Sequence, residues 1–174
     1  GCVIVRDGIV LGQGATQPPG GPHAEVCALR DAAERGIDVR GATVYVTLEP
    51  CSHSGKTPPC ADALIKARVA RVVVAMEDPN PQVSGRGIER LIANRIDVLS
   101  GVCEGEAIRL NEGFISRMKT GRPFVRLKLA ISLDGRVAMA SGESAWITSP
   151  AARADVHRLR LDSCAVLTGI NTVL

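Results

Sequence analysis

Four residues of this sequence, His23, Glu25, Cys51 and Cys60, have the types and spacing of a hydrolytic metal site. A catalytic zinc ion takes three protein ligands, often histidine and cysteine, and leaves a fourth position open to water. Zinc lowers the pKa of that water toward neutrality. A carboxylate two positions after the histidine can take the proton of the water and return it to a leaving nitrogen. The pattern therefore indicates zinc-dependent displacement of an amino group from a ring carbon.

Other interpretations of the same residues stay open at this point. A histidine followed two positions later by a glutamate is common, and cysteines at the two ends of a Pro-rich loop can occur by chance. A structural zinc site would show a fourth Cys or His nearby, and His53 could be that ligand. The chain would then be a non-catalytic module that zinc stabilises.

The elements that must position these residues are those of an α/β domain, because short β-branched runs alternate with segments of helical periodicity. We expect strands at 1–5, 9–14, 43–48, 69–76 and 97–100, and helices at 24–35, 61–67, 87–93 and 104–119. His23 then stands where a loop meets a helix. Cys51 follows a strand, and Cys60 precedes the next helix.

A Gly-Arg-Pro break at 121–123 ends the last of these helices, and the pattern then starts again. We place a domain boundary near 118–123, which gives a first domain at 1–120 and a second, incomplete one at 121–174. In the second part we expect a strand, a helix that Ser149 caps, and another strand, at 124–132, 150–161 and 165–168. The chain has no initiator Met and both ends interrupt apolar runs, so we interpret it as a piece of a longer protein.

Composition argues against several classes of partner. The net charge is +3 without a basic tail, and the chain holds one Trp, one Tyr and two Phe, which is poor material for stacking nucleic-acid bases. No apolar run approaches the roughly 18 residues of a membrane span, and no leader opens the chain. We expect a cytoplasmic protein without a nucleic-acid or membrane partner, in which the six cysteines are thiols or metal ligands.

The residues around the site are specific enough to suggest a family. The segments PHAEV at 22–26 and YVTLEPCSHSGKTPPC at 45–60 closely resemble the bifunctional riboflavin-biosynthesis deaminase/reductases. The resemblance extends to DPNPQV, GRG, LDGR and WITS, at 78–83, 85–87, 133–136 and 146–149. Other zinc deaminases have Pro-Cys-x-x-Cys. The wider spacing of the cysteines here is this family's own.

The resemblance implies a three-layer α/β/α cytidine-deaminase-like domain followed by the beginning of a dihydrofolate-reductase-like α/β domain. The first domain would hydrolyse the 2-amino group of 2,5-diamino-6-(5-phosphoribosylamino)pyrimidin-4-one, a small phosphorylated pyrimidine. The second would use NADPH to reduce the ribosyl chain to ribityl. Family members are commonly dimers or tetramers, so we expect a homo-oligomer.

The resemblance also implies roles for single residues of the first domain. His23, Cys51 and Cys60 would bind zinc, and Glu25 would be the acid/base. In the loop between the cysteines, His53 and Lys56 would face the substrate. A lysine that is merely a solvated loop residue is the alternative for Lys56.

In the second domain the implied residues divide between two ligands. Ser144 and Arg160 would contact the sugar phosphate, where the planar guanidinium suits phosphate oxygens. Ala130, Trp146 and Thr172 would contact NADPH, although Trp146 also suits an ordinary core position. Relative to the family, an N-terminal helix, a later Asp and a Gly-rich cofactor loop are absent, so we expect the reductase to be incomplete in this chain.

One further alternative is a zinc deaminase that acts on another base, a nucleoside or tRNA adenosine. The long loop between the cysteines and the Trp-Ile-Thr-Ser segment argue against it. The scarcity of aromatic residues argues against RNA in particular.

Overall fold

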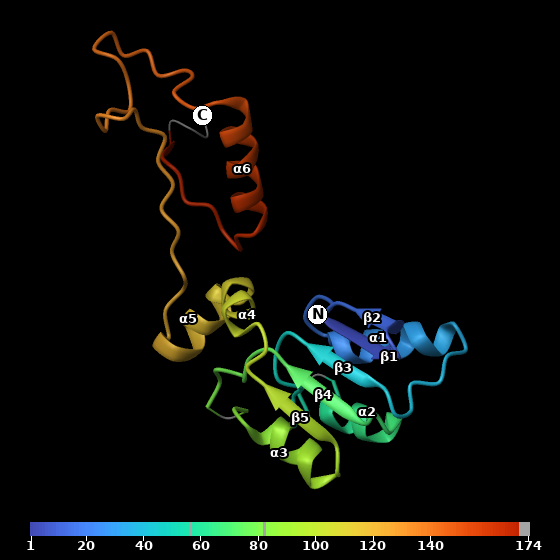
Figure 1. Ribbon diagram of the computed structural model, residues 1–174. Helices are drawn as coiled ribbons and strands as arrows, with labels where there is room; N and C mark the ends of the chain where they lie inside the picture. Colours follow the sequence, from blue (N-terminus) through green and yellow to red (C-terminus); the bar gives the residue numbers. More distant parts are fainter. Residues whose placement is uncertain (56, 82, 171–174) are drawn as a thin grey trace. The chain divides into compact units, whose positions relative to one another are not determined.

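The computed structural model describes residues 1–55, 57–81 and 83–170. The chain divides into two compact units, Gly1–Phe124 and Val125–Leu174, and each is described by itself (Figure 1).

The first unit is built on a five-stranded mixed sheet in the order β2-β1-β3-β4-β5. The strands are β1 Cys2–Arg6, β2 Ile9–Gly14, β3 Thr43–Val46, β4 Arg71–Val74 and β5 Asp97–Ser100. Strand β1 runs antiparallel to both β2 and β3, whereas β3, β4 and β5 are parallel. Asp7 and Gly8 both have positive φ in the β1–β2 hairpin, as a type I′ turn requires. The five expected strands of this part of the chain are confirmed, with shorter bounds for β3 and β4.

Five helices accompany the sheet: α1 Ala24–Glu34, α2 Cys60–Ala67, α3 Arg86–Ala93, α4 Glu104–Leu110 and α5 Glu112–Thr120. Helix α1 packs on β1 and β2 and against α2, and α3 packs on β5 and against α2. The core lies between the sheet and these three helices, where the most buried side chains include Ile4, Val44, Val72, Ala28, Leu64 and Leu91. Among the described residues no helix has the length and apolar character needed to cross a lipid bilayer.

The expected helix at 104–119 is two helices, because Asn111 interrupts it. Its side-chain amide donates to the carbonyl of Ala107 at 2.8 Å, and its backbone φ of −115° leaves the helical range. Asparagine side chains compete with the backbone for such bonds, which is why they favour helix ends. The prediction of one continuous helix was therefore wrong at this residue.

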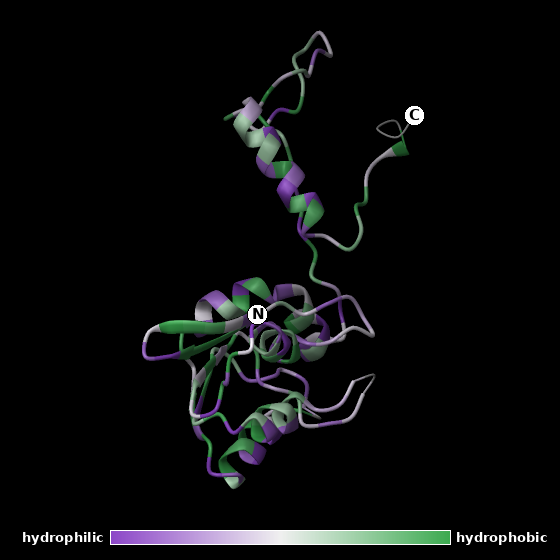
Figure 2. Ribbon diagram, turned by 90° about the vertical axis from the view of Figure 1, so that its right-hand side faces the viewer, coloured by the Kyte–Doolittle hydropathy of each residue, from purple (hydrophilic) through white to green (hydrophobic). Residues whose placement is uncertain are grey.

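The second unit contains one long helix, α6 Pro150–Leu161. Ser149 Oγ accepts a hydrogen bond from the N–H of Ala152 at 3.2 Å, which confirms the expected cap. Apolar and polar residues mix along the helix (Figure 2). The strands expected at 124–132 and 165–168 are not formed, because no described residue of this unit pairs with them. A strand needs a neighbour for its N–H and C=O groups, and Leu127 is 80% exposed.

Candidate metal centre and catalytic site

The fold brings three candidate ligands together from three separate places in the chain. His23 is the N-cap residue of α1 and has extended backbone angles. Cys51 lies in the turn that follows β3, and Cys60 is the first residue of α2. His23 Nδ1 lies 3.6 Å from the Sγ of Cys51 and 3.4 Å from the Sγ of Cys60. These distances place the starts of α1 and α2, which pack against each other, beside the segment that follows β3.

The donor set fits a zinc ion. Zinc–sulfur bonds of about 2.3 Å and zinc–nitrogen bonds of about 2.0 Å place tetrahedral ligand atoms roughly 3.5–3.8 Å apart. The three ligand atoms here all lie within 4.8 Å of one another, and they form the one such group of His, Cys, Asp or Glu found among the described residues. His53 is not part of the group, so the described side chains supply three ligands and leave a fourth position open, as in catalytic zinc sites.

The pKa values of the two cysteine thiols are shifted in opposite directions. The hydrogen bond from the Cys60 side chain is the largest effect that lowers the pKa of the Cys51 thiol, to about 5, against the opposing effect of burial. The backbone N–H of Cys60 adds a second bond to the same sulfur at 3.3 Å. The pKa of Cys60 itself is raised, because its thiol donates to Cys51 and is buried beside Glu25.

Glu25 is a buried carboxyl beside this ligand set. It lies in the first turn of α1 and its exposed fraction is 7%. Burial raises its pKa most, the Cys51 charge raises it further, and hydrogen bonds and the His23 charge oppose the shift. A carboxyl with a raised pKa near a zinc site can hold a proton and release it, which is what acid/base catalysis requires.

The loop between the cysteines carries the expected substrate-facing residues. His53 is exposed, and its charge reaches Asp78, where it opposes the rise in pKa that burial of the Asp78 carboxyl causes. Lys56 lies outside the described residues.

Those of the residues expected to serve reduction that the structure describes lie on the surface of the second unit. Ser144 and Arg160 are exposed, and Ala130 is partly exposed. Trp146 is 77% exposed and therefore does not occupy a core position. The Arg153 guanidinium stacks on its ring, 4.4 Å from the centroid. Thr172 lies outside the described residues.

Sequence reasoning missed two acidic residues near the metal centre. Glu49 is buried two positions before Cys51, and Asp78 is electrostatically linked to Cys51 and His53. Glu49 and Asp78 lie in segments that carry the family resemblance, at 45–60 and 78–83. Their place in these segments is the sequence signal by which they could have been recognised. Their roles depend on backbone partners far along the chain, which the sequence does not indicate.

Two known families match the two parts of the chain. Residues 1–76 match the cytidine and deoxycytidylate deaminase zinc-binding region, and residues 123–174 match the RibD C-terminal domain. The chain is 62% identical to riboflavin biosynthesis protein RibD of Escherichia coli (strain K12), over 100% of this chain and 47% of that protein. It is 50% identical to the protein of the same name from Aquifex aeolicus (strain VF5), over 100% of this chain and 48% of that protein. The chain thus spans about half the length of the curated relatives it matches.

Two solved structures also match nearly the whole length of this chain. RibD of Acinetobacter baumannii, form 1, is 58% identical with a TM-score of 0.85, over 99% of this chain and 48% of that one. A diaminohydroxyphosphoribosylaminopyrimidine deaminase/5-amino-6-(5-phosphoribosylamino)uracil reductase from Thermotoga maritima is 47% identical with a TM-score of 0.91, over 99% of this chain and 49% of that one. The metal-ligand geometry, the two family matches and these relatives lead to one conclusion: the chain belongs to the riboflavin-biosynthesis deaminase/reductase family and carries its zinc-binding deaminase part.

Proposed function

We propose that the protein containing this chain hydrolyses the 2-amino group of 2,5-diamino-6-(5-phosphoribosylamino)pyrimidin-4-one in riboflavin biosynthesis. Residues 1–120 are the deaminase domain, and 121–174 begin a reductase domain that uses NADPH to convert the ribosyl chain to ribityl. The observation that carries the proposal is the convergence of three metal-ligand atoms on one point beside a buried carboxyl. The relatives, and the substrate in the name of the Thermotoga maritima protein, support the choice of pyrimidine.

The chain's own residues divide the chemical work. His23 Nδ1 and the Sγ atoms of Cys51 and Cys60 hold zinc, which when bound lowers the pKa of a water molecule toward neutrality. The Glu25 carboxylate accepts the proton of the attacking water and then donates it to the departing amino nitrogen. Its burial raises the pKa of the carboxyl, which favours the protonated form that has to donate to the leaving nitrogen.

The remaining site residues are proposed from their positions in the family motifs. His53 and Lys56 face the pyrimidine phosphate, and the ammonium of Lys56 supplies a point charge for it. In the reductase part, Ser144 and Arg160 contact the sugar phosphate, and Ala130, Trp146 and Thr172 contact NADPH. The exposure of Trp146 and Arg160 is compatible with ligand contact.

We further propose that the protein acts as a homo-oligomer, a dimer or tetramer, in the cytoplasm and without a nucleic-acid or membrane partner. All six cysteines are free thiols in the structure, as a reducing compartment would keep them.

The decisive experiment is ammonia release from the diaminopyrimidine ribosyl phosphate by the zinc-loaded protein, without NADPH. The Glu25→Gln variant should keep one zinc ion per chain and lose turnover by about 100- to 10,000-fold, the usual contribution of a positioned acid/base. Near-normal turnover in this variant would remove Glu25 from the mechanism. Activity on cytidine with none on the pyrimidine phosphate would favour another zinc deaminase.

A further inference from the structure

Glu49 is an acidic residue that the proposed mechanism does not use. It follows β3 by three residues and precedes Cys51 by two, and its exposed fraction is 3%. Its carboxylate accepts hydrogen bonds from backbone N–H groups only, as far as the described contacts go. Oε2 accepts from the N–H of Asp78 at 3.1 Å and Gly85 at 3.0 Å, and Oε1 from Gly87 at 2.8 Å and Ile88 at 3.3 Å.

Four N–H donors satisfy the lone pairs of an ionised carboxylate, which would otherwise be costly to bury. Two of the donors belong to the first turn of α3, whose positive end favours a negative charge. The N-cap residue of α3 is Gly85, with a φ of 78° and no capping side chain. Glu49 therefore caps α3 from outside the helix and fastens the loop that begins at Asp78.

Helix α3 in turn packs tightly against the backbone that carries Cys51. A Cβ on Gly87 would lie 1.9 Å from the carbonyl oxygen of Pro50, so only glycine fits there. One turn later, Arg90 Nη1 donates to the carbonyl of Ser52 at 3.2 Å. The residues immediately before and after Cys51 are thus both held by α3.

The same arginine connects α3 to the second cysteine. Arg90 Nε forms an ion pair with Asp62 Oδ1 at 2.6 Å, and Asp62 lies in the first turn of α2, two residues after Cys60. The loop fastened by Glu49 also brings Asp78 within electrostatic reach of His53 and Cys51. Helix α3 and its loop therefore touch the turn of Cys51, the loop of His53 and the start of α2.

We propose that Glu49 is a positioning residue for the deaminase reaction: through four backbone amides it fixes the described residues of the 78–88 segment against the Cys51 turn. It does not touch substrate or metal. It sets the distance between the Asp78 loop and the cysteine loop, which under the proposed function faces the pyrimidine phosphate. The proposal rests on the proposed function for its kinetic part only, because the fixing of the segment is measurable without substrate.

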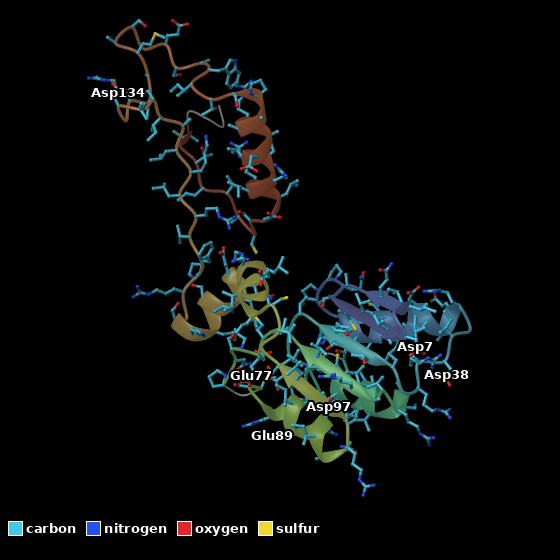
Figure 3. The ribbon with its side chains drawn as sticks, in the orientation of Figure 1. Asp7, Asp38, Glu77, Glu89, Asp97 and Asp134 are labelled. Atoms are coloured by element: carbon cyan, nitrogen blue, oxygen red, sulfur yellow. The ribbon has the colours of Figure 1, made fainter. Side chains whose placement is uncertain are left out.

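The test compares Glu49→Gln with Glu89→Gln in the zinc-loaded full-length protein. Both variants replace a carboxylate by an amide of equal size, and Glu89 is an exposed residue of α3 itself (Figure 3). In Glu49→Gln, the new side-chain NH₂ group would face backbone N–H donors where an acceptor is needed. We expect this variant to keep one zinc per chain and to lose about 10- to 100-fold in kcat/KM, a loss typical of supporting residues around metal sites.

The loss should appear mainly in KM, because Glu25 and His23 are on α1 and are not touched by the change. Glu89→Gln should leave KM, kcat and zinc content unchanged. A wild-type KM in Glu49→Gln, or a loss that merely follows loss of zinc, would overturn the proposal.

Amide hydrogen exchange supplies the readout that needs no substrate. In Glu49→Gln, exchange at Asp78, Gly85, Gly87 and Ile88 should accelerate well before global unfolding, and in Glu89→Gln it should not. If the wild-type protein releases no ammonia, the proposed function fails, and this exchange pattern still decides whether Glu49 fixes the segment. Unchanged exchange at these amides would contradict the inference whatever the activity.

A second variant covers the case in which Glu49→Gln does not fold. Arg90→Gln removes the bond to Ser52 from a side chain that is 45% exposed, so folding should survive. Arg90→Gln should also raise KM, by a smaller factor than Glu49→Gln does. An unchanged KM in Arg90→Gln would show that α3 does not set the geometry of the cysteine loop.

Discussion

At the scale of single residues, the site depends on the burial of carboxyl groups, which are normally exposed in proteins. Glu25 and Glu49 are the two charged residues that are buried among those described, and their surroundings differ. Burial raises the pKa of Glu25, so this carboxyl can exchange a proton. Glu49 is surrounded by N–H donors, which occupy its lone pairs and make it an internal anchor.

Cys2 offers a pH-dependent test of burial at this scale. Burial and the nearby Glu25 charge raise the pKa of its thiol from 9.0 to about 12. The folded state then binds a proton that the unfolded state releases, so stability is complete below about pH 9 and declines as the pH rises toward 12. As the pH rises from 9 to 11, the urea midpoint of unfolding should fall less in Cys2→Ala than in Cys103→Ala. The second variant keeps Cys2 and changes an exposed cysteine instead. Equal slopes for the two variants would show that Cys2 ionises freely.

At the scale of elements, the position of α1 depends on a very close approach to β2. A Cβ on Gly14 would lie 2.4 Å from the carbonyl oxygen of Ala24 and 2.5 Å from the backbone nitrogen of Ala28. The strand can therefore approach the first turns of α1 only if position 14 has no side chain. Because His23 is the N-cap residue of α1, this contact also determines where the imidazole lies.

Gly14→Ala should consequently destabilise the protein by about 1–3 kcal/mol, the usual cost of overpacking against backbone. Zinc affinity should fall with it, since α1 must shift. Gly113→Ala is the matched control, because a Cβ there meets nothing within 4 Å on exposed α5. Chemical denaturation and zinc titration of the two variants would measure both effects. A Gly14→Ala variant as stable as Gly113→Ala would show that β2 and α1 can separate at no cost.

At the scale of the whole molecule, the metal centre connects parts of the first unit that are distant in sequence. It joins the start of α1, the end of β3 and the start of α2, so a bound ion ties all three to the sheet. The second unit contributes no described ligand to this centre. Binding energy at such a site is also folding energy, since the unfolded chain does not hold the ligands together.

Removal of zinc by a chelator should therefore lower the melting temperature of the first unit. Cys51→Ser should do the same and should also lose stoichiometric zinc. Cys103→Ser, which changes an exposed cysteine, should alter neither property. Differential scanning calorimetry with metal analysis would report both quantities together. Full zinc retention in Cys51→Ser would exclude Cys51 from the ligand set.

Much of this arrangement could be predicted from local sequence alone. The Asp-Gly turn between β1 and β2, the Ser-Pro start of α6 and the helix after His23 follow from local preferences of the backbone, and all are present. The types and spacing of the three zinc ligands were likewise readable, because zinc chemistry restricts which side chains can serve. Asn111 was misjudged because helical periodicity continues through it, while its side chain bonds to the preceding turn.

Only the tertiary structure decided which distant groups meet. Among the described residues, the N–H groups that bind the Glu49 carboxylate begin at Asp78, far along the sequence, and any residue type except proline could supply them. The segment 124–132 has a strand-like composition, yet a strand requires hydrogen bonds from a neighbour that the composition cannot supply. The sequence thus determined the ligands, the turns and the caps, whose physics is local. The packing of α1, α2 and α3 determined that the ligand atoms converge and that Glu49 is buried, since both depend on residues brought together by the fold.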